Sequence, residues 1–160
     1  MRKTALVNGC VLTDAGYQEG RAVVVAGGRI AAILPAADLP ADIERHDLGG
    51  AMLLPGFIDT QVNGGGDVLF NDSPTVGGIA AIGAAHRRFG TTGFLPTLIS
   101  DTLGKVAAAR EAVEEAIARR VPGVLGVHLE GPFLSMERRG IHDARKIREI
   151  DDAGVDILTR

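Results

Sequence analysis

Two polar side chains, His128 and Glu130, stand in the otherwise apolar or turn-forming run from Gly126 to Phe133 (GVHLEGPF). Burying a carboxylate is costly unless a cation, a metal ion or several hydrogen-bond donors compensate for its charge. A carboxylate at a strand end, with Gly-Pro fixing the next turn, is typical of a metal ligand. A Glu that caps a helix or forms an ion pair fits the same pattern, so on spacing alone both interpretations of Glu130 stay open.

Histidines extend this candidate site. His128 precedes Glu130 by two residues, so the two side chains share one face if the run is a strand. His128 then either supports a metal ligand from behind or is a core histidine bonded to a backbone carbonyl. His142 is expected on the following loop, as a substrate contact or as a solvated residue. His86, near a predicted helix end, is expected to be a surface cation.

A regular alternation of strands and helices after Pro55 positions these residues. Strand-like runs at 56–62, 93–99 and 124–129 are separated by predicted helices at about 74–89 and 101–120. Two consecutive βαβ units predict an α/β fold with a parallel sheet, which binds ligands beyond the carboxyl ends of its strands. Polar residues cluster at those ends: Asp59, Gln61, Asn63, Thr97, Ser100, Asp101, His128 and Glu130.

The helix boundaries are predicted from capping residues. Ser73, with Pro74 at the first helical position, is expected to start the first helix, and Ser100 or Asp101 the second. A further short helix is predicted near 144–152.

The first 54 residues differ in pattern from the rest of the chain. Short β-type runs alternate with tight turns, and those at 21–26 and 29–34 flank Gly27-Gly28, which predicts a hairpin. This segment is predicted to form a small antiparallel sheet.

Composition excludes several classes of protein. The 160 residues carry a net charge of -3 and only 4% aromatic residues, which gives no electrostatic or stacking surface for nucleic acid. No apolar run predicts a membrane span, and no secretory signal is recognisable, so the cytoplasm is the expected compartment. Cys10 is the one cysteine, so no internal disulfide can form. The length is below the ~250 residues of a complete (β/α)8 barrel.

Five segments together resemble the N-acetylglucosamine-6-phosphate deacetylases of the amidohydrolase superfamily: Leu54–Gly66 (LPGFIDTQVNGGG), Phe70–Asp72 (FND), Phe94–Leu98 (FLPTL), Val127–Phe133 (VHLEGPF) and Gly140–His142 (GIH). The resemblance implies that residues 1–54 are a portion of a small β-sandwich. It also implies that residues 55–160 are the first three βα units of a (β/α)8 catalytic barrel, which is incomplete here.

The resemblance also implies hydrolysis of the N-acetyl group of N-acetylglucosamine-6-phosphate to glucosamine-6-phosphate and acetate. Glu130 matches the carboxylate metal ligand, and Ile141 (through its backbone) and His142 match a substrate-binding pair. Gln61 and Asn63 stand where many amidohydrolases carry the His-x-His of a second metal. Amides are poor substitutes for imidazole on zinc, so one divalent ion, expected to be zinc, is predicted. His128 is expected to lie behind the ligands.

The family's catalytic Asp and its two histidine ligands match positions beyond Arg160, so no catalytic residue is expected in this chain, and the 160 residues alone are predicted to be inactive. The family suggests a homodimer for the full-length protein. N-Acetylgalactosamine-6-phosphate is an alternative substrate, and a truncated, non-catalytic relative that acts as a binding module is an alternative role. Another type of amidohydrolase is disfavoured by Gln61-x-Asn63.

Overall fold

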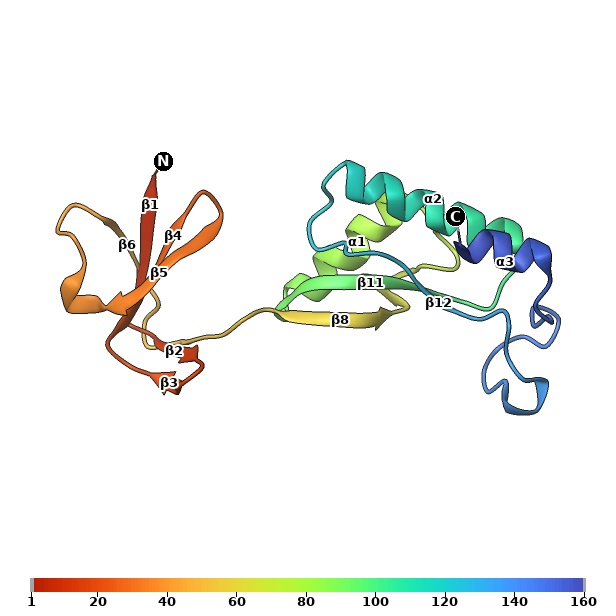
Figure 1. The fold of residues 1–160 in the computed structure, drawn as a ribbon, viewed down its shortest axis with the longest axis horizontal. Coiled ribbons are helices and arrows are strands. Elements are labelled where there is room, and N and C mark those ends of the chain that lie inside the picture. Colours follow the sequence, from red (N-terminus) through yellow and green to blue (C-terminus); the bar gives the residue numbers. More distant parts are fainter. Residues whose placement is uncertain (1, 160) are drawn as a thin grey trace. The chain divides into compact units, whose positions relative to one another are not determined.

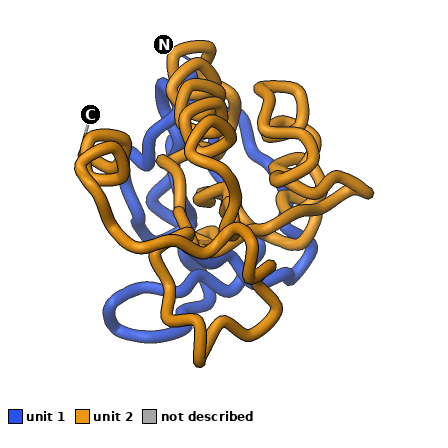
Figure 2. The backbone as a smooth tube through the Cα atoms, turned by 90° about the vertical axis from the view of Figure 1, so that its right-hand side faces the viewer, with its two compact units in different colours: residues 1–55 blue, residues 56–160 orange. Residues whose placement is uncertain are grey.

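The computed structural model describes residues 2–159, which divide into two compact units with the boundary between Pro55 and Gly56 (Figure 2). The first unit contains seven strands and one short 3-10 helix in this order: β1 (Lys3–Val7), β2 (Cys10–Thr13), β3 (Gly16–Gln18), β4 (Arg21–Ala26), β5 (Arg29–Pro35), η1 (Ala36–Asp38), β6 (Glu44–Asp47) and β7 (Met52–Leu53).

The predicted hairpin is confirmed by the antiparallel pairing of β4 with β5 around Gly27 and Gly28, which both have positive φ. The predicted small antiparallel sheet is confirmed for the pairing of β1 with β4 and of β2 with β3, and it is wrong for β6 and β7. The four-stranded sheet has the order β5-β4-β1-β6, and β6 runs parallel to β1; in the three-stranded sheet β3-β2-β7, β7 runs parallel to β2. Strand patterning identifies a strand but not its partner, and the long stretch of chain between Val7 and Glu44 allows β6 to run in the same direction as β1.

The second unit combines strands and helices over residues 56–159. Its elements are β8 (Phe57–Val62), β9 (Gly64–Gly65), β10 (Val68–Leu69), α1 (Val76–Arg87), β11 (Thr91–Ile99), α2 (Leu103–Ala118), β12 (His128–Glu130), η2 (Met136–Arg138) and α3 (Asp152–Thr159). Strands β12, β11 and β8 form a parallel sheet in that order, which confirms the predicted parallel sheet (Figure 1).

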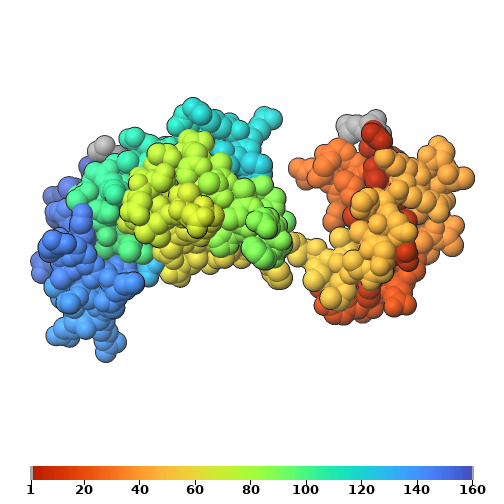
Figure 3. Space-filling model, turned by 180° about the vertical axis from the view of Figure 1, so that it is seen from behind, coloured from red at the N-terminus to blue at the C-terminus, as the bar shows by residue number. Residues whose placement is uncertain are grey.

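Helices α1 and α2 lie side by side on one side of this sheet and enclose the core of the unit (Figure 1). The core contains Ile79 and Ile82 of α1, Phe94 and Leu98 of β11, and Val106 and Val113 of α2. In the space-filling view the yellow-green surface of α1 adjoins the green surface of α2 (Figure 3). The apolar residues of both helices are therefore turned toward the sheet.

The third strand is shorter than predicted. Val124 forms an isolated bridge to Phe94, whereas regular pairing with β11 begins only at His128, opposite Thr97. One more residue lies between the two pairings on this segment than on β11, so the strand bulges around Gly126 before it joins the sheet.

Both long helices begin later than predicted. Thr75 caps α1 by accepting a hydrogen bond from the Gly78 N–H (3.1 Å), and Thr102 caps α2 by accepting one from Lys105 (3.3 Å). Asp101 instead contacts Asn71 and Lys146. The prediction of a helix at 144–152 is also wrong, because α3 begins only at Asp152. The preceding residue, Asp151, accepts a hydrogen bond from the Gly154 N–H at the start of this helix.

The glycines at 64–66 form a tight turn that packs against His86. Gly64 and Gly65 pair with Val68 and Leu69 in a tight hairpin, and the His86 Nε2 lies 2.8 Å from the Gly64 carbonyl oxygen. A Cβ on Gly65 would approach the His86 ring to 2.9 Å. His86 is thus half-buried against the hairpin and does not stand free on the surface as expected. Within residues 2–159, no helix is long and apolar enough to cross a bilayer.

Candidate functional site

Glu130 is the last residue of β12 and lies at the carboxyl end of the parallel sheet. Its Oε2 accepts a hydrogen bond from the Gln61 Nε2 of β8 (2.9 Å), and its Oε1 lies 3.5 Å from the His142 Nε2. The side chain is 32% exposed, so solvent or a ligand can reach it. The structure thus brings three of the predicted site residues, Gln61, Glu130 and His142, to one place.

His142 is buried, with 7% of its surface exposed, although its loop position allowed a solvated residue. Its Nδ1 accepts a hydrogen bond from the Ser100 N–H (3.4 Å) and lies 2.8 Å from the Ser100 Oγ. The neighbouring Ile141 is 90% exposed, and its side chain lies in solvent. Only the backbone of Ile141 therefore remains as its expected contribution to ligand binding.

His128 contacts the neighbouring strand. Its Nδ1 lies 3.2 Å from the Oγ1 of Thr97, its register partner on β11. The Thr97 hydroxyl donates to the Leu95 carbonyl (3.3 Å), so its oxygen is left to accept from the His128 ring. His128 is thus tied to a buried hydroxyl group of the sheet.

Asn63 directly follows β8, and its carbonyl oxygen accepts a hydrogen bond from the Phe70 N–H (2.8 Å). This bond starts the β9–β10 hairpin. The half-buried Asn63 is placed at the same end of the sheet as Gln61 because it follows the same strand.

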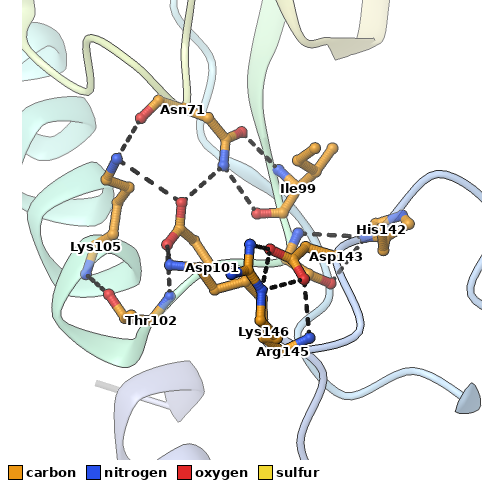
Figure 4. Close-up of polar contacts among 10 residues, drawn as sticks. Asn71, Ile99, Asp101, Thr102, Lys105, His142, Asp143, Arg145 and Lys146 are labelled. Atoms are coloured by element: carbon orange, nitrogen blue, oxygen red, sulfur yellow. Dashed lines mark hydrogen bonds and ion pairs between the residues drawn. The ribbon is translucent and has the colours of Figure 1, made fainter.

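A polar network beside these residues was not predicted from the sequence (Figure 4). The Asn71 side chain pairs with the end of β11 as a neighbouring strand would: its Oδ1 accepts from the Ile99 N–H (3.0 Å), and its Nδ2 donates to the Ile99 carbonyl (3.2 Å). The same Nδ2 lies 3.3 Å from the Asp101 Oδ2. In the sequence, Asp101 stood among the polar residues at the strand ends and Asn71 stood in the FND segment, but neither pattern indicated which residues they would contact.

Two lysines complete this network (Figure 4). The Lys105 Nζ donates to the Asn71 carbonyl (2.8 Å) and lies 3.8 Å from Asp101, whereas the Lys146 Nζ lies 2.8 Å from the Asp101 Oδ1. Burial by itself would raise the pKa of Asp101. Hydrogen bonds from Lys146, the Thr102 N–H and Asn71 outweigh burial and hold that pKa below its usual value.

An exposed ion pair flanks His142. Hydrogen bonds from the Arg145 side chain and N–H lower the pKa of Asp143 to about 2. Asp143 therefore stays ionised at any pH near neutrality, next to the buried imidazole.

The residues at this end of the sheet supply one clear ligand for a metal ion. Glu130 offers carboxylate oxygens at a solvent-accessible position, and Gln61 orients that carboxylate. Hard divalent ions and zinc accept such an oxygen. Among residues 2–159, no group of three or more His, Cys, Asp or Glu side chains could hold a metal ion. The chain thus fits a metal as a contributor to a site and does not form a complete one.

Most of the chain is similar in sequence to known sugar-phosphate deacetylases. Residues 4–53 match the NagA composite domain family. The chain is 43% identical to the N-acetylgalactosamine-6-phosphate deacetylase of Shewanella sp. (strain ANA-3), covering 93% of this chain and 41% of that protein. It is 36% identical to the N-acetylglucosamine-6-phosphate deacetylase of Haemophilus influenzae, covering 98% of this chain and 41% of that protein.

Solved structures agree with these relatives. The crystal structure of N-acetylglucosamine-6-phosphate deacetylase from Pasteurella multocida matches with a TM-score of 0.93 and 36% identity, over 98% of this chain and 41% of that one. The Mycobacterium smegmatis D267A mutant enzyme, in complex with N-acetyl-D-glucosamine-6-phosphate, matches with a TM-score of 0.84 and 28% identity, over 98% and 40%. The chain therefore spans about two fifths of the length of these relatives. By sequence and by fold, it belongs to the N-acetylglucosamine-6-phosphate deacetylase family and corresponds to the N-terminal part of that family's proteins.

Proposed function

We propose that this chain contributes to the metal-dependent removal of the acetyl group from N-acetylglucosamine-6-phosphate, which yields glucosamine-6-phosphate and acetate. The observation that carries the proposal is the placement of the Glu130 carboxylate. It lies at the carboxyl end of a parallel sheet, fixed by Gln61 on one oxygen and facing His142 with the other.

In this proposal Glu130 is one ligand of a single divalent ion, zinc being the expected one. The other ligands and the catalytic Asp come from sequence C-terminal to Arg160, a region that the longer relatives possess. When bound, the ion supplies Lewis acidity, which polarises the acetamide carbonyl and makes water easier to deprotonate. Gln61 keeps the Glu130 carboxylate in one orientation, which is what a ligating oxygen needs from its neighbours.

His142 and the backbone of Ile141 are proposed to bind the amino-sugar phosphate. The imidazole is buried and held by Ser100, so little conformational freedom remains to be lost when a substrate binds. Residues 55–160 are proposed to form the first three βα units of a (β/α)8 barrel, and residues 1–54 part of a small β-sandwich. A homodimer in the cytoplasm is proposed for the full-length protein.

N-Acetylgalactosamine-6-phosphate is the second candidate substrate, because a relative at 43% identity is named as the deacetylase of that sugar. The two sugars differ in the orientation of one hydroxyl group.

The test uses the protein expressed over its whole reading frame, loaded with zinc, with acetate release measured from both sugar phosphates. We expect a higher kcat/KM for N-acetylglucosamine-6-phosphate; the reverse order would support the second candidate. Residues 1–160 alone, and the Glu130→Gln variant of the full protein, are expected to release no acetate above background. If neither sugar phosphate were turned over, the proposed activity would be contradicted and a non-catalytic binding module would be favoured.

A further inference from the structure

The contact between Ser100 and His142 fixes which nitrogen of the imidazole carries the proton. We propose that Ser100 is the positioning residue of His142: it keeps Nδ1 unprotonated, so that the neutral ring presents Nε2–H toward Glu130 and toward an oxygen of the bound ligand. The role of His142 in substrate binding rests on the proposed function, whereas its protonation pattern does not.

The argument starts at Nδ1. A backbone N–H can only donate, and the Ser100 N–H points at Nδ1 from 3.4 Å, so Nδ1 acts as the acceptor. The Ser100 hydroxyl, 2.8 Å away, can donate to the same nitrogen. A neutral imidazole has a single N–H, which must then be on Nε2.

The far side of the ring leads to the same conclusion. Nε2 lies 3.5 Å from the Glu130 Oε1. A proton on Nε2 faces the carboxylate with a positive partial charge, whereas an unprotonated Nε2 would set its lone pair against those of the carboxylate oxygen. Both sides of the imidazole therefore favour the same tautomer.

The surroundings hold both partners in place. Ser100 is 5% exposed and His142 is 7% exposed, so water does not compete for their contact. Ile99, which precedes Ser100, is paired on both its N–H and its carbonyl by Asn71. Asp101, which follows Ser100, binds Lys146 from the loop that carries His142 (Figure 4).

Gly131 provides the space that the Ser100 hydroxyl occupies. A Cβ at Gly131, whose φ is +103°, would lie 2.1 Å from the Ser100 Oγ. A larger residue at position 131 would therefore push the Ser100 hydroxyl away from its position beside His142.

This arrangement decides what His142 can bind. A protonated Nε2 donates to oxygen acceptors such as a hydroxyl, a phosphate or a carboxylate, and it has no lone pair for a metal ion. With Ser100 on Nδ1, the ring can donate from Nε2 to an oxygen of the ligand but cannot ligate a metal ion through Nε2, although Nε2 lies beside the Glu130 carboxylate.

The test measures the histidine ¹⁵N resonances of the zinc-loaded protein expressed over its whole reading frame, with the His142 signals assigned by a His142→Gln variant. We expect the Nε2–H tautomer to dominate in the wild type and to persist in Ser100→Ala, which keeps the backbone N–H at Nδ1 and loses only the hydroxyl contact that holds the ring in place. Ser100→Ala should raise KM about five- to tenfold, the factor expected for one lost hydrogen bond, and should leave kcat nearly unchanged.

Two further variants separate positioning from folding. Ser135→Ala alters an exposed serine whose side chain makes no capping bond, and it should change neither the tautomer nor KM. Ser100→Thr retains a hydroxyl and should keep the wild-type KM. A dominant Nδ1–H tautomer in the wild type, or an unchanged KM in folded Ser100→Ala, would overturn the inference. A wild-type protein that shows the expected tautomer but has no deacetylase activity would overturn only the proposed function.

Discussion

The Lys146 Nζ lies 2.8 Å from the Asp101 Oδ1, and this ion pair joins the loop that carries His142 to the residue that follows Ser100 on the sheet (Figure 4). The Asp101 side chain is mostly buried and the Lys146 side chain is about one third exposed. The loop after β12 is long and has little regular structure, so a tether of this kind is needed to hold it at the sheet edge. A second bond, from the Arg148 N–H to the Pro132 carbonyl, closes the loop on itself.

Replacing the lysine tests the tether. Lys146→Met removes the charge and keeps most of the chain length, and we expect it to lower the free energy of unfolding by about 1 kcal/mol, a value reduced for the partial exposure of the pair. Amide hydrogen exchange at His142 should become faster. Arg145→Met, which breaks the more exposed pair with Asp143, is the matched control and should change neither quantity. Equal effects of the two variants in urea unfolding would contradict the tether.

The pH dependence of stability follows from Asp101. Its pKa in the folded protein lies below the ordinary value of 3.8, so the ionised carboxylate stabilises the fold. For a lowered pKa, this stabilisation is complete above pH 3.8 and is lost as the pH falls below it, through the folded-state pKa. Asp101→Asn should therefore be less stable than wild type near neutrality, by about 1 kcal/mol. This difference should shrink toward zero in acid.

The check is a set of urea titrations of both proteins between pH 7 and the acid limit of folding. Asp72→Asn, an exposed carboxylate on the same segment as Asn71, is the control and should follow the wild-type curve. A wild-type advantage over Asp101→Asn that is constant with pH would show that the Asp101 charge does not support the fold.

Asn71 acts as a substitute for a neighbouring strand. Asn71→Ala would leave the half-buried Ile99 N–H and carbonyl without their side-chain partner, and the loss of two hydrogen bonds costs about 1–3 kcal/mol. We expect a loss of that size in the free energy of unfolding, together with loss of hydrogen-exchange protection at the Ile99 amide. The adjacent Asp72→Ala should retain both, because Asp72 is exposed. An Ile99 amide that stays protected in Asn71→Ala would show that another group satisfies it.

The sequence pattern predicted those elements that depend on interactions between residues close in the chain. The strands at 56–62 and 93–99 and the intervening helix follow from apolar runs and capping residues, and they are found with small shifts. The shifts arise where several capping residues are adjacent. Thr102 caps α2 because Asp101 is occupied by Lys146, a residue 45 positions away that no local pattern identifies.

The candidate site was predictable to the same degree. Parallel strands end at one edge, so the meeting of Gln61 with Glu130 follows from the βαβ pattern. The burial of His142 does not follow, because it depends on Ser100, Lys146 and the path of an irregular loop. The parallel partner of β1 was missed for the same reason, since pairing across a long connection leaves no periodic mark in the sequence.

The hydrogen bond from Gln61 to Glu130 leads to a prediction about metal affinity. If Glu130 ligates zinc, the amide that orients its carboxylate should matter nearly as much as a ligand, because partners of this kind typically change metal affinity 10–100-fold. Gln61→Ala in the protein expressed over its whole reading frame should therefore weaken zinc binding by about that factor, measured by competition with a chelator.

The loss of deacetylase activity in Gln61→Ala should then be partly reversed by excess zinc, since the carboxylate itself remains. Gln18→Ala is the matched control: this glutamine accepts a hydrogen bond from Arg21 in the first unit, and its removal should leave the zinc affinity unchanged. An unchanged zinc affinity in Gln61→Ala, with a clear loss in Glu130→Gln, would mean that Glu130 ligates the ion without help from β8. An unchanged affinity in both variants would remove Glu130 from the metal site, because a ligating carboxylate cannot be replaced by a neutral amide without cost.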